Sequence, residues 1–568
     1  MSAPLDLLLM WHMHQPDYRD YATGEYTQPW VYLHALKDYS DMAAHLERHT
    51  RVHAVVNLVP ILLDQIEDYV DQFATGRLRD PLLRLLRRDE RQTLTDEERK
   101  LIASRCFSAN HEKMVEPYPP YKRLRELHRV FNGDDAHAMA YLSDRYFDDL
   151  LVWYHLAWTG ETVRRGSELI ARLMSEGGNY SAQDRMALYE LVGEVIAGII
   201  PRYRALAEQG RIELTTTPHY HPLAPLLLDF NSAREARPTF KLPNAGRYSG
   251  GHARVRFHID SALQTHARRF GTTPVGIWPA EGAISEALAE MFGEAGFAWT
   301  ASSESVLAQS LQAARIIKVA EEWPAERARW LYRPWRLAAD GPLLLFRDDR
   351  LSDLIGFEYA KWHSRDAALN LIAELDGIAA RAERQQTPLV SIILDGENCW
   401  EHYPYNGFYF LEALYAALEG HPSIRTVTGK AVVDGQRHPP AELERLVAGS
   451  WVHGDFGTWI GSRDKNAAWD LLATAKQCFN LVMGSDRLTE AERAAAERQL
   501  ASCESSDWFW WMGDYNPPEA VAAFDQRYRA NLANLYRLLK LPAPHTLDVP
   551  LSHGTGQPET GGTMRRAT

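Results

Sequence analysis

The chain has 568 residues, which is enough for two or three domains with ample buried core. Its 62 basic and 75 acidic residues give a formal charge of −13, which argues against a nucleic-acid-binding surface. No segment reaches the roughly 20 apolar residues that a spanning helix requires, so a membrane is not an expected partner either.

The aromatic residues indicate a class of ligand, and the cysteines indicate a cellular location. The 17 Trp and 25 Tyr are an unusual load, and rings beside polar loops suit a ligand with flat apolar faces and many hydroxyls, as carbohydrates have. The four Cys show no CxxC spacing, which predicts reduced thiols in a cytoplasmic protein. The apolar run at residues 7–11 is short and has no basic segment before it, so we expect a strand and not a signal peptide.

Seven short apolar runs occur along the chain, and each ends in a polar cluster. Most are separated by helical stretches, a pattern typical of a parallel sheet with right-handed crossovers. Polar motifs after each run predict an α/β fold with an incomplete (β/α)7 TIM-like barrel. The runs are Leu7–Met10, His53–Leu58, Arg211–Thr216, Val275–Trp278, Phe297–Ala301, Leu343–Phe346 and Leu389–Leu394.

Two stretches have helical spacing of their apolar residues. Residues 64–210 predict a long helical insertion, with Ser181 and Asp184 as a capping pair and Gly210 as a stop. Helical spacing returns after about residue 430, where Thr489 and Glu492 form a predicted capping box. We therefore expect a catalytic barrel over residues 1–430, a C-terminal helical-bundle domain over residues 431–545 that adds aromatic loops to the active site, and a disordered tail over residues 546–568.

Two acids follow strands and have aromatic neighbours. Asp395 opens a nine-residue stretch with seven polar or aromatic side chains, and Glu281 comes three residues after Trp278. Glycoside hydrolysis needs one carboxylate as nucleophile or base and one protonated acid. A Trp-lined pocket would raise the pKa of one acid and leave the other ionised. Alternatively, Glu281 is simply an acid at the start of the next helix.

The histidines allow several interpretations. In His12-x-His14 and His219-x-His221 both side chains of a pair share one face of a strand, so the pairs with Asp395 could form a zinc site. They could equally hydrogen-bond sugar hydroxyls, orient the carboxylates, or include one structural histidine per pair.

Two further loops are rich in Trp. The loop at residues 450–461 is polar and Gly-rich, which favours Trp451 and Trp459 as a sugar-stacking wall over core packing. The cluster at residues 508–511 fits either role. Walker-type, GxGxxG and GxSxG motifs are absent from the sequence, so phosphate and nucleophile-elbow chemistry have little support.

Five of these motifs, in order, resemble the signature regions of glycoside hydrolase family 57 over about residues 5–515. The resemblance implies a (β/α)7 barrel with an added helical domain and retaining action on α-glucans, with Glu281 as nucleophile and Asp395 as acid/base. The last two regions look closest to the amylopullulanase and α-amylase branch. Some branches place Pro directly before the Glu of the third region, so the local turn here could differ. The regions are His12–Pro16, Thr217–Leu223, Gly276–Glu281, Leu394–Asn398 and Trp451–Gly461.

We therefore expect a retaining hydrolase of α-1,4 and, as an option, α-1,6 linkages in α-glucans, acting without metal or cofactor as a monomer or a homodimer. Alternatives are a 4-α-glucanotransferase or branching enzyme of the same family, a Zn-dependent carbohydrate deacetylase or hydrolase, and a non-catalytic glucan-binding protein. The side chains expected to contact substrate are His12, His14, Gln15, His221, Trp278, Asp349, Glu397, Trp400, His453, Asp455, Trp459 and Trp511.

Overall fold

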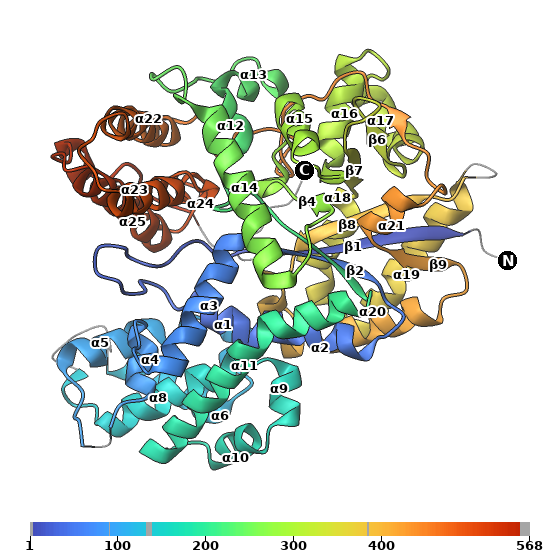
Figure 1. Ribbon diagram of the computed structural model, residues 1–568. Coiled ribbons are helices and arrows are strands. Elements are labelled where there is room, and N and C mark those ends of the chain that lie inside the picture. Colours follow the sequence, from blue (N-terminus) through green and yellow to red (C-terminus); the bar gives the residue numbers. More distant parts are fainter. Residues whose placement is uncertain (1–3, 90, 132–138, 383–385, 557–568) are drawn as a thin grey trace.

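The computed structural model describes residues 4–556 apart from residue 90, residues 132–138 and residues 383–385. It is a mixed α/β fold in which a parallel-rich sheet is surrounded by helices (Figure 1). All seven expected strands are present. They are β1 (Leu5–Met13), β2 (Ala54–Leu58), β3 (Ile212–Thr215), β4 (Gly276–Ile277), β5 (Trp299–Ser303), β7 (Leu343–Arg347) and β8 (Leu389–Asp395), with the short additions β6 (Trp335–Arg336), β9 (Ile424–Val427) and β10 (Ala441–Glu442).

Strand pairing brings the ends of distant segments together. β1 pairs in parallel with β2, β8 and β9, and β5 pairs in parallel with β4 and β7. The register places His12 opposite Asn57 on β2 and Asp395 on β8. A parallel bridge from Thr216 to Ile277 links the end of β3 to β4. The carboxyl ends of the strands therefore share one edge, where the predicted motifs meet.

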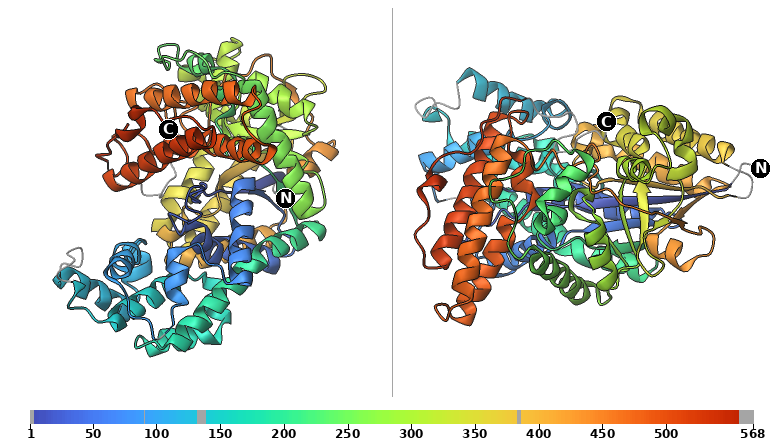
Figure 2. Two further views of the ribbon diagram at one scale, coloured as in Figure 1. Left: turned by 60° about the vertical axis from the view of Figure 1, so that its left-hand side comes forward. Right: turned by 90° about the horizontal axis from the view of Figure 1, so that it is seen from above.

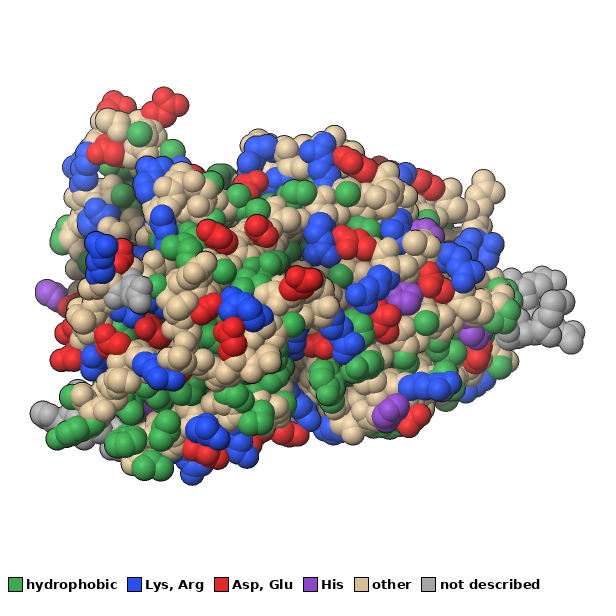
Figure 3. Space-filling model, turned by 90° about the horizontal axis from the view of Figure 1, so that it is seen from below, with side chains coloured by type: hydrophobic (Ala, Val, Ile, Leu, Met, Phe, Trp, Pro, Cys, Tyr) green, Lys and Arg blue, Asp and Glu red, His purple; other side chains and the backbone are tan. Residues whose placement is uncertain are grey.

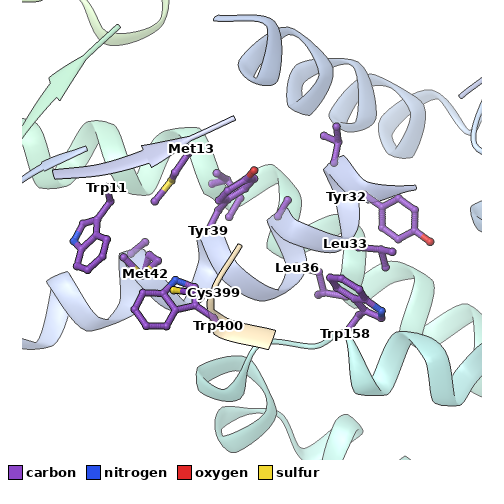
Figure 4. Packing of buried hydrophobic residues seen from close by; sticks show 14 of the residues in the cluster. Trp11, Met13, Tyr32, Leu33, Leu36, Tyr39, Met42, Trp158, Cys399 and Trp400 are labelled. Atoms are coloured by element: carbon purple, nitrogen blue, oxygen red, sulfur yellow. The ribbon is translucent and has the colours of Figure 1, made fainter. Parts of the chain in front are cut away.

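The strands are apolar because both of their faces are covered. Every residue of β1 and β8 is buried, as expected for parallel strands with helices packed against them. On one side Trp11 and Met13 of β1 face Tyr39 and Met42 across the core (Figure 4). Each such side chain contributes roughly 1.5–3 kcal/mol by burial.

The long helical insertion lies between β2 and β3. Its final helix begins with the predicted capping pair, since the amide of Asp184 donates to Ser181 Oγ (3.1 Å) and the amide of Ser181 donates back to Asp184 Oδ2 (2.9 Å). The main helices are α3 (Pro60–Thr75), α4 (Pro81–Leu86), α5 (Asp96–Arg105), α6 (Pro119–Val130), α8 (Asp144–Ala157), α9 (Glu161–Gly166), α10 (Glu168–Glu176) and α11 (Ala182–Glu208).

The C-terminal helices form a second helical group on the other side of the strands (Figure 2). Their core is not confined to residues 431–545, because α12 (Ala224–Leu228) and α14 (Gly251–Phe270) share it: Leu226 and Ile259 belong to the same cluster as Trp469 and Leu532. The C-terminal helices are α22 (Arg463–Met483), α23 (Glu490–Cys503), α24 (Ser506–Trp511) and α25 (Pro518–Leu538).

Further helices connect and cover the strands. They are α1 (Trp30–His34), the π-helix η1 (Ala35–Tyr39), α2 (Ser40–Arg48), α13 (Ala233–Ala236), α15 (Glu286–Glu294), α16 (Glu304–Ala313), α17 (Val319–Leu331), α18 (Asp349–Asp353), α19 (Ser364–Arg381), α20 (Phe408–Gly420) and α21 (Gly429–Asp434).

The segment after α25 includes residues 546–556, the first part of the tail predicted to be disordered. Ser552 of this segment is buried, and its Oγ accepts a hydrogen bond from the amide of Gly513 (2.8 Å). The amide of Gly556 also donates to the carbonyl of Asn516 (3.0 Å). The rest of the predicted tail, residues 557–568, lies outside the described residues.

The surface carries charges of both signs. On the face shown in Figure 3, Lys and Arg side chains are interspersed with Asp and Glu. Within the described ranges, every helix falls short of the length and apolar character that crossing a bilayer requires.

Candidate active site

A cavity of about 710 Å³ opens at the carboxyl ends of the strands. Its floor comes from residues at the ends of β1, β4, β7 and β8, and aromatic residues from other parts of the chain line its sides. The floor includes His12, His14, Glu281, Arg347 and Asp395; α1 contributes Trp30 and His34; the insertion contributes Asn110 and Trp158; the C-terminal helices contribute Trp510, Trp511 and Phe524.

Glu281 sits on a strained turn just after β4. Its backbone is left-handed (φ 60°, ψ 21°), and Gly282 is also left-handed (φ 59°). A Cβ at Gly282 would lie 3.0 Å from the ring of Trp278, so the turn requires glycine there. Strain of this kind in a non-glycine residue is typical of functional sites.

Two donors hold the carboxylate of Glu281. Trp451 Nε1 donates to Oε2 (3.1 Å) and Ser506 Oγ lies 3.1 Å from Oε1. The amide of Trp451 also donates to the carbonyl of Glu281 (3.1 Å), which ties the Trp451 loop to this turn. The side chain keeps 12% of its surface exposed toward the cavity.

Asp395 ends β8 and faces the same cavity. Asn398 Nδ2 donates to its Oδ2 (2.8 Å), and the amide of Gly396 donates to the carbonyl of His12 (2.7 Å). A Cβ at Gly396 would lie 3.0 Å from the Met13 side chain, which would have to shift by a few tenths of an ångström to admit it.

Burial dominates the charge state of both acids. Burial, followed by the charges of Asp507 and Asp395, raises the pKa of Glu281 to about 8. Burial raises the pKa of Asp395 to about 6, opposed by Asn398, His14 and Arg347. Near pH 7, therefore, Glu281 holds the proton and Asp395 is ionised.

Three histidines stand beside the acids. The rings of His14 and His221 stack with centroids 3.8 Å apart, and His14 Nε2 lies 3.0 Å from Asp507 Oδ1. Burial and the neighbouring His14 and His12 rings hold the pKa of His221 well below its usual value, so this imidazole is neutral. His12 Nδ1 lies 2.6 Å from Asn57 Oδ1.

The zinc site suggested by the sequence does not assemble. His219 points away from the cavity, with Nε2 2.9 Å from Asp64 and Nδ1 2.7 Å from Ser261 Oγ. His14, His221 and Asp507 do bring ligand atoms within 4.8 Å of one another. However, the rings of His14 and His221 are nearly parallel (19°), so their in-plane lone pairs do not converge on one point, as a tetrahedral ion requires.

Several of the residues predicted to contact substrate line the cavity. Glu397 is among them, and its Oε1 accepts a hydrogen bond from the amide of His14 (3.0 Å), so it also fixes the loop after β1. Trp511 stacks on Phe524 with ring centroids 4.6 Å apart. The predicted residues that line the cavity are His12, His14, Gln15, His221, Glu281, Asp395, Glu397, Trp451 and Trp511.

Three tryptophans predicted to contact substrate lie in the core. Trp278, Trp400 and Trp459 are buried and do not belong to the described lining of the cavity. Trp400 packs beside Cys399, Met42 and Trp11 (Figure 4), and its ring centroid is 5.8 Å from that of Trp11. Trp459 lies in the core of the C-terminal helices, where its carbonyl accepts a hydrogen bond from Trp469.

Three predicted polar contacts also lie outside the described lining. Asp349 pairs with Arg347 (2.7 Å) and so supports a residue that does line the cavity. Asp455 accepts from Arg237 Nε (2.6 Å) and from the amide of Gly457 (2.7 Å), which closes its own loop. His453 takes a left-handed backbone conformation (φ 58°) in the same loop.

The structure adds residues that the sequence did not single out. Ser506 and Asp507 contact Glu281 and His14, and Arg347 and Trp158 line the cavity. A signal was present for the first two, since a Ser-Ser-Asp run directly before a Trp cluster is poor core material. Arg347 was visible only as one charge among several after its strand.

The fold and the cavity define an α/β enzyme whose site lies at the carboxyl edge of a parallel sheet. The chain belongs to glycosyl hydrolase family 57, whose model matches residues 8–447. This membership makes it a glycoside-processing enzyme.

Solved structures agree with this fold. A branching enzyme of the family from Thermococcus kodakaraensis is 14% identical, with a TM-score of 0.56 over 94% of this chain and 90% of that one. The branching enzyme from Pyrococcus horikoshii is also 14% identical, with a TM-score of 0.52 over 96% of each chain. The α-amylase AmyC from Thermotoga maritima is 12% identical, with a TM-score of 0.54 over 95% of this chain and 93% of that one.

Proposed function

We propose that the protein is a retaining hydrolase of α-glucans, of the amylopullulanase and α-amylase type. The observation that carries the proposal is the placement of two acids in one aromatic-lined cavity: Glu281, whose side chain is 12% exposed, and the buried Asp395, each of which follows a strand of the sheet. Two carboxyl groups facing one glycosidic bond are what double displacement needs.

In the first step Glu281 attacks the anomeric carbon while Asp395 gives its proton to the leaving oxygen. In the second step Asp395 takes a proton from water, and that water releases the sugar from Glu281. Trp451 Nε1 and Ser506 Oγ fix the Glu281 carboxylate, and Asn398 holds one oxygen of Asp395.

These two pKa values place the proton on Glu281 and leave Asp395 ionised, which is the reverse of what the attack needs. With the pKa of Glu281 at about 8 and that of Asp395 at about 6, the reactive form is a minority, roughly one molecule in a hundred. Substrate that covers Asp395 excludes water from it and raises its pKa further, which favours the reactive form.

Two parts of the chain contribute differently to the proposed activity. We propose that residues 1–430 form the catalytic unit around an incomplete (β/α)7 barrel, in support of which the Thr216–Ile277 bridge connects β3 to β4. Residues 431–545 add Trp451, Ser506 and Asp507 to the cavity.

A second candidate function is transfer of the glycosyl group from Glu281 to a sugar acceptor instead of to water. The observation that favours it is the extent of the cavity, whose aromatic walls lie on both sides of the acids and leave room for a second saccharide.

The test compares wild type with Glu281→Gln and Asp395→Asn on maltoheptaose, pullulan and α-glucosyl fluoride. Wild type is expected to give shorter sugars with matching new reducing ends, first released as the α-anomer. Asp395→Asn should lose about a thousand-fold or more on maltoheptaose. On the fluoride, whose leaving group needs no acid, it should still release a rapid burst of about one fluoride per active site and then turn over slowly, because it lacks the base for the second step.

Glu281→Gln should be inactive on all three substrates. Pullulan cleavage would add α-1,6 or mixed specificity. Products longer than maltoheptaose without new reducing ends would show a transferase, and near-full activity of either variant would refute the assignment of its acid.

A further inference from the structure

The segment Glu504–Asp507 enters the catalytic centre from the C-terminal helical group. It connects α23 to α24, and it pairs with the segment that carries His221: the amide of Ser506 donates to the carbonyl of His221 (2.9 Å), and Pro222 bridges to Ser505. Backbone contacts therefore help to fix the position of this segment beside His221.

A buried ionic network fixes the start of this segment. Glu504 is fully buried and accepts hydrogen bonds from Tyr248 Oη (2.6 Å), Arg254 Nε (2.8 Å) and His258 Nε2 (2.8 Å). All three partners belong to α14 or the loop before it, so α14 holds the segment against the cavity.

The side chain of Ser506 connects two groups of the site. Its Oγ lies 3.1 Å from Glu281 Oε1 and 2.8 Å from His221 Nδ1. A hydroxyl has one hydrogen, so when Glu281 is ionised Ser506 donates to it and His221 Nδ1–H donates to Ser506. His221 Nε2, which is buried and lacks a protein partner among the described atoms, is then left as a bare acceptor at the cavity.

Asp507 acts on the other histidine. Its two oxygens lie 3.0 and 3.1 Å from His14 Nε2, and Ser505 Oγ donates to its Oδ2 (2.5 Å). Because His14 stacks on His221, holding one ring holds the other.

We propose that Ser506 and Asp507 are positioning residues of the catalytic centre: Ser506 orients and stabilises the ionised Glu281 carboxylate, and Asp507 locks the stacked His14–His221 pair beside it. The C-terminal helical group is then a part of the catalytic centre and not only a wall for substrate. This proposal rests on the proposed role of Glu281 as nucleophile.

The two residues have opposite effects on the charge of Glu281. The Ser506 hydrogen bond favours its carboxylate, whereas the negative charge of Asp507 disfavours it. The other titratable or charged groups around Glu281 are Asp395 from β8, His221 from the segment after β3, and His14 from the loop after β1, with Arg347 from β7 on the same cavity wall.

The experiment measures kcat, KM and the pH profile of kcat/KM on maltoheptaose for Ser506→Ala, Ser506→Thr and Asp507→Asn. Ser485→Ala and Asp464→Asn are matched controls, since both lie on or beside α22 and outside the described lining of the cavity. Ser506→Ala should lower kcat roughly ten- to a hundred-fold with little change in KM, because a hydrogen bond to a charged group is lost.

The pH profile separates this role from a structural one. Ser506→Ala should move the alkaline limb upward and Asp507→Asn should move it downward, each by about one pH unit. Ser506→Thr, which keeps the hydroxyl, should retain most of kcat and the wild-type limb, and both controls should match wild type.

Unshifted limbs in Ser506→Ala and Asp507→Asn, or shifts of both in the same direction, would overturn the inference. If Ser506→Ala does not fold, the downward shift in Asp507→Asn decides the question. Glu281→Gln is measured alongside: full activity of that variant refutes the proposed function itself, whereas an inactive Glu281→Gln with unshifted limbs refutes only this inference.

Discussion

At the scale of single residues, the two acids make the activity depend on pH in a defined way. The reactive form needs Glu281 ionised and Asp395 protonated, while the order of their pKa values, about 8 and about 6, favours the opposite form. Between these values the reactive fraction is constant and small, and it falls on either side. The two limbs belong to the pair and not to either residue alone.

We therefore predict a bell-shaped profile of kcat/KM with apparent pKa values of about 6 and about 8. At alkaline pH activity is lost because Glu281 and Asp395 are both ionised, so Asp395 has no proton to give to the leaving oxygen. On the acid side it is lost because Glu281 stays protonated. Initial rates at substrate concentrations well below KM measure this, and a flat profile from pH 5 to pH 9 would contradict it.

Residues at the cavity were predictable from the sequence where they directly follow a strand. Glu281, Asp395, His12 and His14 each come directly after or at the end of an apolar run, so sequence position alone places them at the cavity. Trp459 was not predictable, because its polar, Gly-rich neighbours suggested a surface loop. The structure shows that these neighbours form a tight turn while the indole packs inward against the helical core.

At the scale of elements, the positions of the strands were predictable from the sequence. The approach of the C-terminal helices to the cavity was not. A run such as residues 389–395 is apolar because both of its faces are buried, so the run can be recognised as a strand from the sequence alone. The approach of α23 and α24 to the cavity depends on Glu504, which looks like an ordinary surface acid in the sequence. Its partners on α14 are about 250 residues away, a separation that local patterns do not encode.

We therefore expect Glu504 to contribute more to the free energy of unfolding than a glutamate on the surface does. Burial alone would raise its pKa, but Arg254 and His258 lower the pKa of Glu504 to about 2. We predict that Glu504→Gln lowers the free energy of unfolding by about 3–5 kcal/mol, because it leaves the buried Arg254 without its main partner. Denaturant unfolding measures the loss.

Glu497→Gln is the matched control, since Glu497 also pairs with Arg254 but is 27% exposed, and its loss should cost under about 1 kcal/mol. The folded-state pKa of Glu504 lies below its unfolded value of 4.5, so its contribution is complete above pH 4.5 and is lost as the pH falls toward 2. Equal costs for the two variants at pH 7 would contradict this account of the network.

At the scale of the whole molecule, the site exists because three parts of the chain meet. The strands supply the acids, α1 and the insertion together supply Trp30 and Trp158, and the C-terminal group supplies Trp510 and Trp511 together with Ser506 and Asp507. The order of these parts was predictable from the change in periodicity along the chain. Their meeting was not, because it depends on side chains that pack only once the parts have folded.

Trapping of the covalent intermediate tests the central claim most directly. The protein is incubated with 5-fluoro-α-glucosyl fluoride, which forms the glycosyl-enzyme quickly and releases it slowly, and peptides are then analysed by mass spectrometry. We expect one fluoroglucosyl ester, located on Glu281, and none in Glu281→Gln. An adduct on Asp395 or Asp507, or turnover of the reagent with inverted product and no adduct, would contradict it.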